Sequence, residues 1–229
     1  MSWTAPVDNY CERLDASFWA EPLNAVTNMA FLVAALLAWR VSGRENRREP
    51  LTILLIAIAA AVGVGSFLFH TFATRWAGVA DTAPILLFIL VYLFAATRRF
   101  LRLGLVASLM APALFIGFAI AFISLWRDFL PSLNGSEGYL PVLVALLVFG
   151  AALTARGHGA GAGLLIAAAV FALSLTFRSM DRSVCADLPF GVHFLWHCFN
   201  GLLLLLVMLT FIRHGAKSGD PLARRPAQG

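Results

Sequence analysis

The sequence predicts an all-α integral membrane protein, built as a bundle of seven transmembrane helices. Of its 229 residues, 60% are hydrophobic and only 13% are charged, and the mean hydropathy is +0.83. Soluble domains average about 45–50% apolar and about 25% charged residues, so we expect lipid rather than water to surround the fold. A helix needs about 20 apolar residues to cross the hydrocarbon core, and seven segments reach that length, some of them only just.

The predicted spans follow one another with short breaks. They cover residues about 24–41, 51–72, 79–97, 103–126, 139–156, 160–178 and 191–213. Residues 42–50, 131–138 and 156–159 are rich in charged, glycine and proline residues, and Arg98, Arg99 and Arg102 bracket another turn. The span 160–178 is rich in Ala and Gly, which favours close helix packing. We therefore expect one domain, residues 1–213, followed by a polar tail, residues 214–229.

The basic residues predict the orientation in the membrane. Twelve of them fall on the side of the 42–50 loop and five on the other side, and basic residues accumulate on the cytoplasmic side. The N-terminus is therefore expected outside and the C-terminus in the cytoplasm. Because the net charge of +5 is spread over loop ends, we assign it to topology and not to nucleic-acid binding.

Five polar residues on three of the predicted spans are expected in one layer near the outer boundary. Ser66 and His70 lie at the outer end of the second span, and Asp81 lies at the outer start of the third. His193 and His197 lie in the first turns of the seventh. Residues four apart share one face of a helix, and polar side chains within a membrane indicate a functional site.

Three histidines on two helices match the ligand set of a catalytic zinc site, which keeps a fourth position for water. The spacing thus predicts zinc on His70, His193 and His197, with Asp81 transferring protons and Ser66 donating a hydrogen bond to the oxyanion. The alternative is a receptor-like or channel-like protein with a structural metal, for which Cys198 is the nearest fourth ligand. A light-driven or ion-moving protein would need a lysine in the last span, and the sole lysine is in the tail.

The three cysteines divide between two environments. Cys11 and Cys185 both fall on the predicted outer side, where an oxidising milieu permits a disulfide; two unpaired thiols are the alternative. Cys198 lies within the last span, where we expect a small buried residue.

The ordered motifs resemble those of the alkaline ceramidases, part of a membrane-hydrolase superfamily that includes the adiponectin receptors. The resemblance runs from residue 8 to about residue 213. It is carried by the following segments: Asp8-Asn9-Tyr10-Cys11-Glu12, Glu21-x2-Asn24-x3-Asn28, Gly65-Ser66-Phe67-Leu68-Phe69-His70, Asp81-Thr82-Ala83-Pro84 and His193-x3-His197.

The resemblance implies an intramembrane zinc amidase that splits ceramide into a sphingoid base and a fatty acid. It assigns zinc to His70, His193 and His197, assisting roles to Ser66 and Asp81, and a disulfide to Cys11 and Cys185. It also implies calcium beside the zinc layer. The candidate calcium ligands are Asn9, the carbonyl of Tyr10, Glu12, Asp15 and Glu21, and the alternative is an acidic cap on the first span.

Several features depart from the eukaryotic pattern. Asn9-Tyr10 stands where that pattern has Asp-Trp, the spacing between Glu12 and Glu21 is shorter by two, and Asp81-Thr82-Ala83-Pro84 replaces Asp-Glu-Leu-Pro. The chain also lacks long appended segments, which favours a bacterial member, placed in the inner membrane with its site toward the periplasm. The expected partners are the bilayer and a ceramide-like lipid. Another lipid amide or ester is the alternative substrate, and the oligomeric state stays open.

Overall fold

The computed structural model describes residues 2–215. Residues 216–229, nearly all of the predicted tail, lie outside the described residues. In the described part the chain is helical, with these elements in order: α1 Pro22–Thr27, α2 Met29–Arg44, α3 Pro50–Phe72, α4 Arg75–Arg99, α5 Leu105–Phe129, η1 Ser136–Tyr139, α6 Leu140–Ala155, α7 Ala160–Met180, η2 Asp181–Ser183 and α8 His193–His214.

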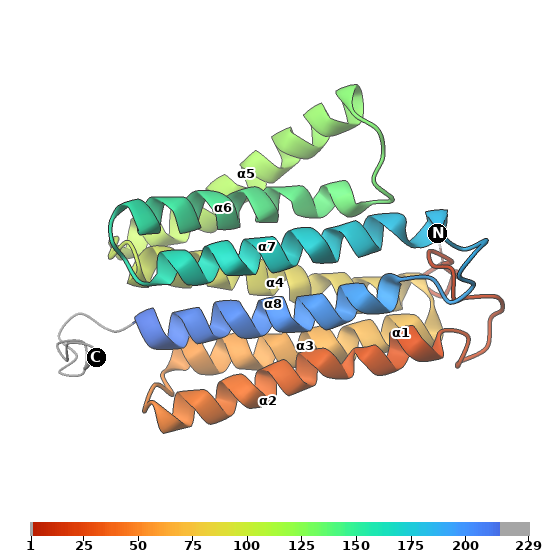
Figure 1. The fold of residues 1–229 in the computed structure, drawn as a ribbon, viewed down its shortest axis with the longest axis horizontal. Coiled ribbons are helices and arrows are strands. Elements are labelled where there is room, and N and C mark those ends of the chain that lie inside the picture. The colour runs from red at the N-terminus through yellow and green to blue at the C-terminus, as the bar shows by residue number, and fades with distance from the viewer. Residues whose placement is uncertain (1, 216–229) are drawn as a thin grey trace.

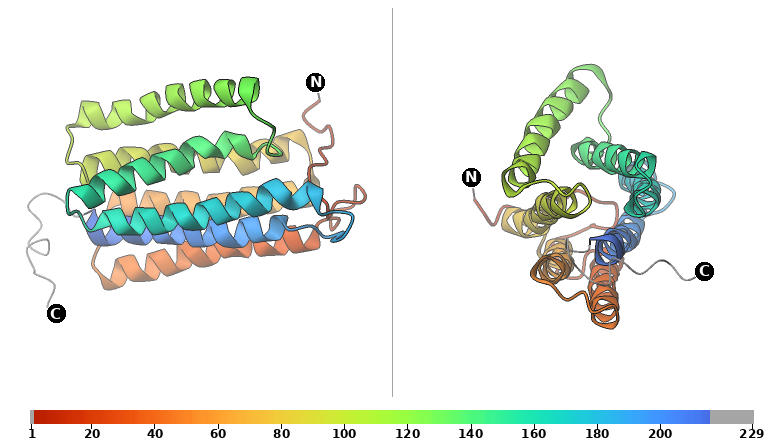
Figure 2. Two further views of the ribbon diagram at one scale, coloured as in Figure 1. Left: turned by 45° about the horizontal axis from the view of Figure 1, so that its top comes forward. Right: turned by 90° about the vertical axis from the view of Figure 1, so that its left-hand side faces the viewer.

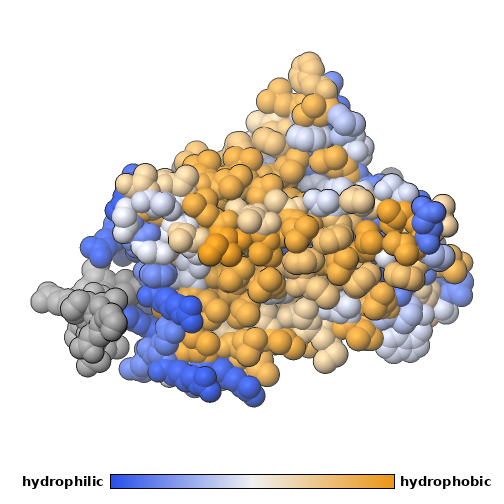
Figure 3. Space-filling view, viewed as in Figure 1, coloured by the Kyte–Doolittle hydropathy of each residue, from blue (hydrophilic) through white to orange (hydrophobic). Residues whose placement is uncertain are grey.

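The prediction of an all-α protein with seven membrane-spanning helices is confirmed. Seven helical stretches within residues 2–215 are long and apolar enough to span a bilayer, with α1 and α2 together forming the first. Most of them run side by side along the long axis, whereas α5 is inclined to it (Figure 1). Side chains on the visible face form an apolar band between more hydrophilic ends (Figure 3), as a lipid environment requires.

Local sequence signals explain where the helices begin. Pro22 and Pro50 stand in the first turn of α1 and α3, where the missing N–H of proline costs no intrahelical hydrogen bond. The helix α4 begins at Arg75, earlier than the predicted residue 79, because Ala73 turns the chain in a left-handed conformation and Thr74 serves as an extended N-cap. The polar residues at this end of α4 lower its hydropathy, which is why the apolar pattern placed the start too late.

The helix α8 is the most buried span and α5 the least. The helices α2, α3 and α7 pack around α8, whereas α5 contacts mainly α4 and is splayed from the bundle at one end (Figure 2). Fully buried alanines bring the backbones close together, as small residues do in membrane bundles; examples are Ala38, Ala59, Ala95, Ala160 and Ala167.

Cys198 is more exposed than the sequence predicted. The prediction of a small buried residue is wrong, because its side chain is exposed on the outside of the bundle. One residue along a helix corresponds to a rotation of about 100°. The step from His197, which faces the core, to Cys198 therefore turns the thiol outward.

The N-terminal segment crosses one end of the bundle. Pro6 forms a β-bridge with Thr74, and the Val7 N–H donates to the Ala73 carbonyl at 2.8 Å. Further along, Cys11 is joined by a disulfide to Cys185 in the loop before α8. The segment thus covers the end at which α3 finishes and α4 and α8 begin, and the predicted pairing of these two cysteines is present.

Candidate metal centre and its cavities

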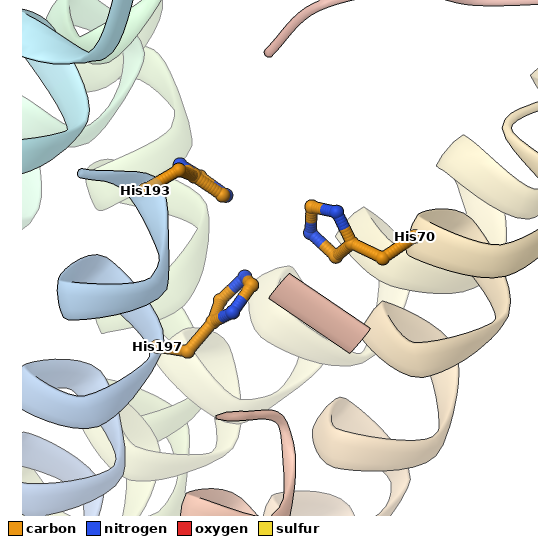
Figure 4. A group of neighbouring side chains, drawn as sticks. All are labelled: His70, His193 and His197. Atoms are coloured by element: carbon orange, nitrogen blue, oxygen red, sulfur yellow. The ribbon is translucent and has the colours of Figure 1, made fainter. Parts of the chain in front are cut away.

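Three buried imidazoles meet at the covered end of the bundle (Figure 4). His70 stands in the last turn of α3, and His193 and His197 stand in the first two turns of α8. Each is only 1% exposed, and one ring nitrogen from each lies within 4.8 Å of the other two. The sequence prediction that these three histidines gather at one point is therefore matched by the geometry.

The hydrogen bonds of the rings define where their lone pairs lie. The His70 Nδ1 is 2.6 Å from the Glu21 Oε2, and a carboxylate can only accept, so Nδ1 carries the proton. The His197 Nδ1 is 3.0 Å from the Thr27 Oγ1, whose own proton is given to the Leu23 carbonyl. In both rings Nε2 is thereby left as the acceptor.

Two of the ring nitrogens are buried without a partner in the described structure, namely His193 Nδ1 and His197 Nε2. A buried polar atom left unpaired is costly, and native proteins avoid it unless an ion or water completes the site. Metal-bound histidines also donate their second N–H to a carboxylate or another oxygen, as His70 and His197 do here. The donor set therefore fits a zinc ion.

A chain of hydrogen bonds leads from His70 through Glu21 to Arg13. The Arg13 Nε donates to the Glu21 Oε1 at 2.6 Å, and both side chains are buried. Burial raises the pKa of Glu21, but the hydrogen bonds and charges of His70 and Arg13 together lower it further, so the net shift is downward. Glu21 consequently stays ionised while it orients the His70 ring.

Ser66 and Asp81 are brought together by a close approach of α3 and α4. Pro84 has no N–H to give to the Ala80 carbonyl, which is thus left free of its helical bond. The backbone of Gly65 packs against that carbonyl so closely that a Cβ would collide with it. The contact places the next residues, Ser66 and Asp81, at the junction of the two helices.

Two cavities meet at this junction. The polar cavity, about 400 Å³, is lined by His193, His197, Arg75 and Arg178. The apolar cavity, about 100 Å³, lies within the bundle and is lined chiefly by hydrocarbon and aromatic side chains, among them Phe88, Tyr92, Phe149, Leu203 and Val207. Both cavities share the side chains of Ser66, Asp81, Ile85, Tyr139 and Trp196.

The family model described as Ceramidase matches residues 3–223 of this chain. The chain belongs to the ceramidase family. No curated protein matches the sequence. Membership in the ceramidase family implies a membrane-embedded hydrolase of lipid amides, with ceramide as the lipid on which the family acts. The three close histidines are consistent with a metal-dependent ceramidase.

Three of the residues expected to bind calcium in this ceramidase-family protein, Glu12, Asp15 and Glu21, have carboxylates that accept hydrogen bonds from protein donors. The Glu12 carboxylate accepts the N–H groups of Leu23 and Asn24, at 2.7 and 2.8 Å. That is the geometry of the acidic cap, the alternative considered above for the first span. Asp15 is exposed and accepts the Ser17 N–H at 2.8 Å.

A guanidinium group lies among the remaining oxygens of the predicted calcium site. Besides Glu21, Arg13 donates to the carbonyls of Asp15 and His70, each at 3.1 Å. The ring of Tyr10 stacks on His193, with the ring centroids 3.7 Å apart, and Asn9 is exposed beside the polar cavity. These contacts do not fit a calcium ion, and the mechanism below does not involve one.

Sequence reasoning missed Asp181, which fixes the start of α8. Its buried carboxylate accepts the N–H groups of Cys11, Val192 and His193, at 3.1, 2.8 and 2.9 Å. Gly191 adopts a φ of +64°, and a Cβ there would collide with Asp181. An acidic side chain at a helix N-terminus also matches the helix dipole. Asp181 lies 12 positions before His193, and spacing alone does not show that the chain turns back to bring the two together.

Proposed function

We propose that this protein is a zinc-dependent amidohydrolase that cleaves the N-acyl amide of ceramide-like lipids into a sphingoid base and a fatty acid. One observation supports this most: the three histidines gather beside Ser66 and Asp81, where a polar and an apolar cavity meet, and two of them, His193 and His197, have a buried nitrogen without a partner. A lipid amide has this same division, with a polar head on one side of the scissile bond and a hydrocarbon chain on the other.

The histidines His70, His193 and His197 would hold the zinc ion. Zinc, when bound, polarises a carbonyl and lowers the pKa of a bound water toward neutrality. Asp81 accepts a proton from the attacking water and passes it to the amine nitrogen as the C–N bond breaks. Ser66 donates its hydroxyl proton in a hydrogen bond to the carbonyl oxygen as negative charge develops there. The water oxygen ends on the acyl carbon, which gives a carboxylate and a free amine.

The acyl chain occupies the apolar cavity. Its lining reaches along α4 from Asp81 to Ala96, which at about 1.5 Å per residue is roughly 22 Å. That length suits a long hydrocarbon chain. Because the cavity lies among membrane-spanning helices, the lipid enters laterally from the bilayer.

We further propose that the metal centre faces the periplasm of a bacterial cell, with the N-terminus outside and the C-terminus in the cytoplasm. The Cys11–Cys185 disulfide at the metal end supports an oxidising compartment there. The opposite end carries most of the basic residues, such as Arg44, Arg98 and Arg156, as the cytoplasmic side of a membrane protein does.

Among the alternatives considered above, a structural metal finds little support in these contacts. A structural zinc is closed by four protein ligands, and the group of close metal-binding side chains found within residues 2–215 contains the three histidines without Cys198. An open fourth position is what hydrolysis needs.

The proposal is tested by ceramide hydrolysis with and without a chelator, in purified wild type and in His197→Ala, with zinc measured in each. The wild type should bind about one zinc per chain and hydrolyse ceramide until the chelator is added; His197→Ala should lose both. His214→Ala, an exposed histidine at the other end of the same helix, is the matched control. Zinc-free wild type that still hydrolyses ceramide would refute the proposal.

A further inference from the structure

Arg178 is a cation in the polar cavity that the mechanism above does not use. It stands two residues before the end of α7 at Met180 and is half-buried. It lines the same cavity as His193 and Asp81. An ionisable side chain in a membrane-spanning helix is costly and indicates a functional role.

The contacts of Arg178 hold its guanidinium in place without neutralising it. Its Nη1 donates to the Asn134 carbonyl and to the Ser136 Oγ, both at 2.9 Å. The guanidinium carbon lies 5.2 Å from the ring centroid of Tyr139 and 5.6 Å from that of Trp196. No carboxylate of residues 2–215 lies within ion-pair distance of it, so its charge is directed at the cavity.

The charge of Arg178 acts near the metal centre. Arg178 and Tyr10 both line the polar cavity. The Tyr10 ring is the one that stacks on His193. Arg75 also lines the polar cavity, and like Arg178 it has no ion-pair partner in the described part of the chain. Asp81 contributes the one carboxylate among the residues that line this cavity. Positive charge therefore exceeds negative charge in this cavity even before a metal is counted.

A fixed guanidinium recognises one kind of ligand well. Its planar fork binds carboxylates and phosphates with paired hydrogen bonds, and it loses little hydration on burial compared with an ammonium group. Ser66 and Asp81 separate the polar cavity from the apolar cavity that takes the acyl chain. The group that reaches Arg178 is therefore on the amine side of the scissile amide.

We propose that the preferred substrates of this site are N-acyl lipids whose amine portion carries a carboxylate or phosphate, and that Arg178 binds that anion. Arg75 adds positive charge to the same cavity. This inference rests on the proposed hydrolysis, and it makes the amine portion, rather than the acyl chain, the part that the protein selects by charge. A neutral ceramide would leave the guanidinium without its counter-ion.

The test compares three amides that share one acyl chain: N-palmitoylglycine, N-palmitoyl-O-phosphoethanolamine and the neutral N-palmitoylethanolamine. The wild type should show a higher kcat/KM for at least one of the two anionic amides, and these two show whether carboxylate or phosphate is preferred. In Arg178→Gln the anionic-to-neutral ratio should fall about 10-fold to 100-fold, since hydrogen bonds to charged groups contribute about 1.5–3 kcal/mol. The exposed Arg182→Gln should keep the wild-type ratio.

Binding of the same amides to chelator-treated protein, which cannot turn them over by the proposed route, separates this inference from the proposed function. Tighter binding of an anionic amide that is lost in Arg178→Gln would support it even if no hydrolysis were seen. Equal kcat/KM for anionic and neutral amides in the wild type would overturn it. So would a ratio unchanged by Arg178→Gln, as expected if Arg178 only contacts bilayer phosphates.

Discussion

The polar and apolar cavities share five lining side chains and several helices, but they differ in nearly everything else. The polar cavity is lined by two of the histidines, two arginines and Asp81, whereas the apolar cavity, apart from Ser66, Asp81 and Asn200, is lined by hydrocarbon and aromatic residues. The helices α3, α4 and α8 contribute to both cavities. The difference is therefore one of depth along the same helices, and the proposed mechanism puts the reacting bond where the change occurs.

This comparison implies a division of labour. Substitutions around the polar cavity should impair hydrolysis whatever the acyl chain, and substitutions deep in the apolar cavity should change which chain is accepted.

Asp81→Asn removes the proposed proton acceptor at the junction of the cavities. We expect turnover to fall about 100-fold or more, because general acid–base catalysis contributes about 10²–10⁴-fold, while zinc content stays at the wild-type level. Turnover is measured by steady-state kinetics with amides of long and short acyl chains, and zinc content is measured by metal analysis. The exposed Asp128→Asn is the control. Normal turnover in Asp81→Asn would remove this residue from the mechanism.

Glu21→Gln keeps a hydrogen-bond acceptor beside His70 but removes the negative charge. Loss of such a supporting group typically lowers metal affinity about 10-fold to 100-fold, and we expect that loss here. Zinc affinity is measured by competition with a chromogenic chelator. Glu45→Gln, at the opposite end of the bundle near Arg213, should leave the affinity unchanged. An unaltered affinity in Glu21→Gln would mean that the negative charge of Glu21 does not contribute to zinc binding.

Leu203→Trp fills part of the apolar cavity below His197. We expect kcat/KM for a long-chain amide to fall about 10-fold relative to a short-chain amide, since each methylene in an apolar pocket contributes about 1–3 kcal/mol. Leu202→Trp, whose side chain is 41% exposed on the outside of the bundle, is the matched control. If both chain lengths suffered equally in Leu203→Trp, the apolar cavity would not be the chain-binding site.

Hydropathy was sufficient to predict the seven spans because a membrane helix must be apolar along most of its length. The histidine cluster was also predictable, because residues four apart on a helix share a face, and the four spans between His70 and His193, an even number, bring the chain back to the same end. Helix starts such as Arg75 were harder to predict, because polar residues near the membrane surface lower the local hydropathy.

The contacts that support the metal centre were not predictable from spacing. Glu21 was assigned to calcium, yet its carboxylate bonds His70 and Arg13, an arrangement that depends on how the N-terminal segment folds over α3. Arg178 contributed only to a count of basic residues, because nothing in a single sequence indicates that it faces the cavity. Buried polar pairs are specified by tertiary packing, which local periodicity does not encode.

The metal centre draws its parts from both ends of the chain. Cys11 and Glu21 are synthesised first, His193 and His197 are synthesised last, and the disulfide joins residues 174 positions apart. Chains emerge N-terminus first during synthesis. The first helices are therefore in the membrane, with Glu21 and His70, before His193 and His197 have been made. A ribosome that stops before α8 would release a chain without a metal site. Loading of the proposed metal would therefore report that insertion of every helix is complete.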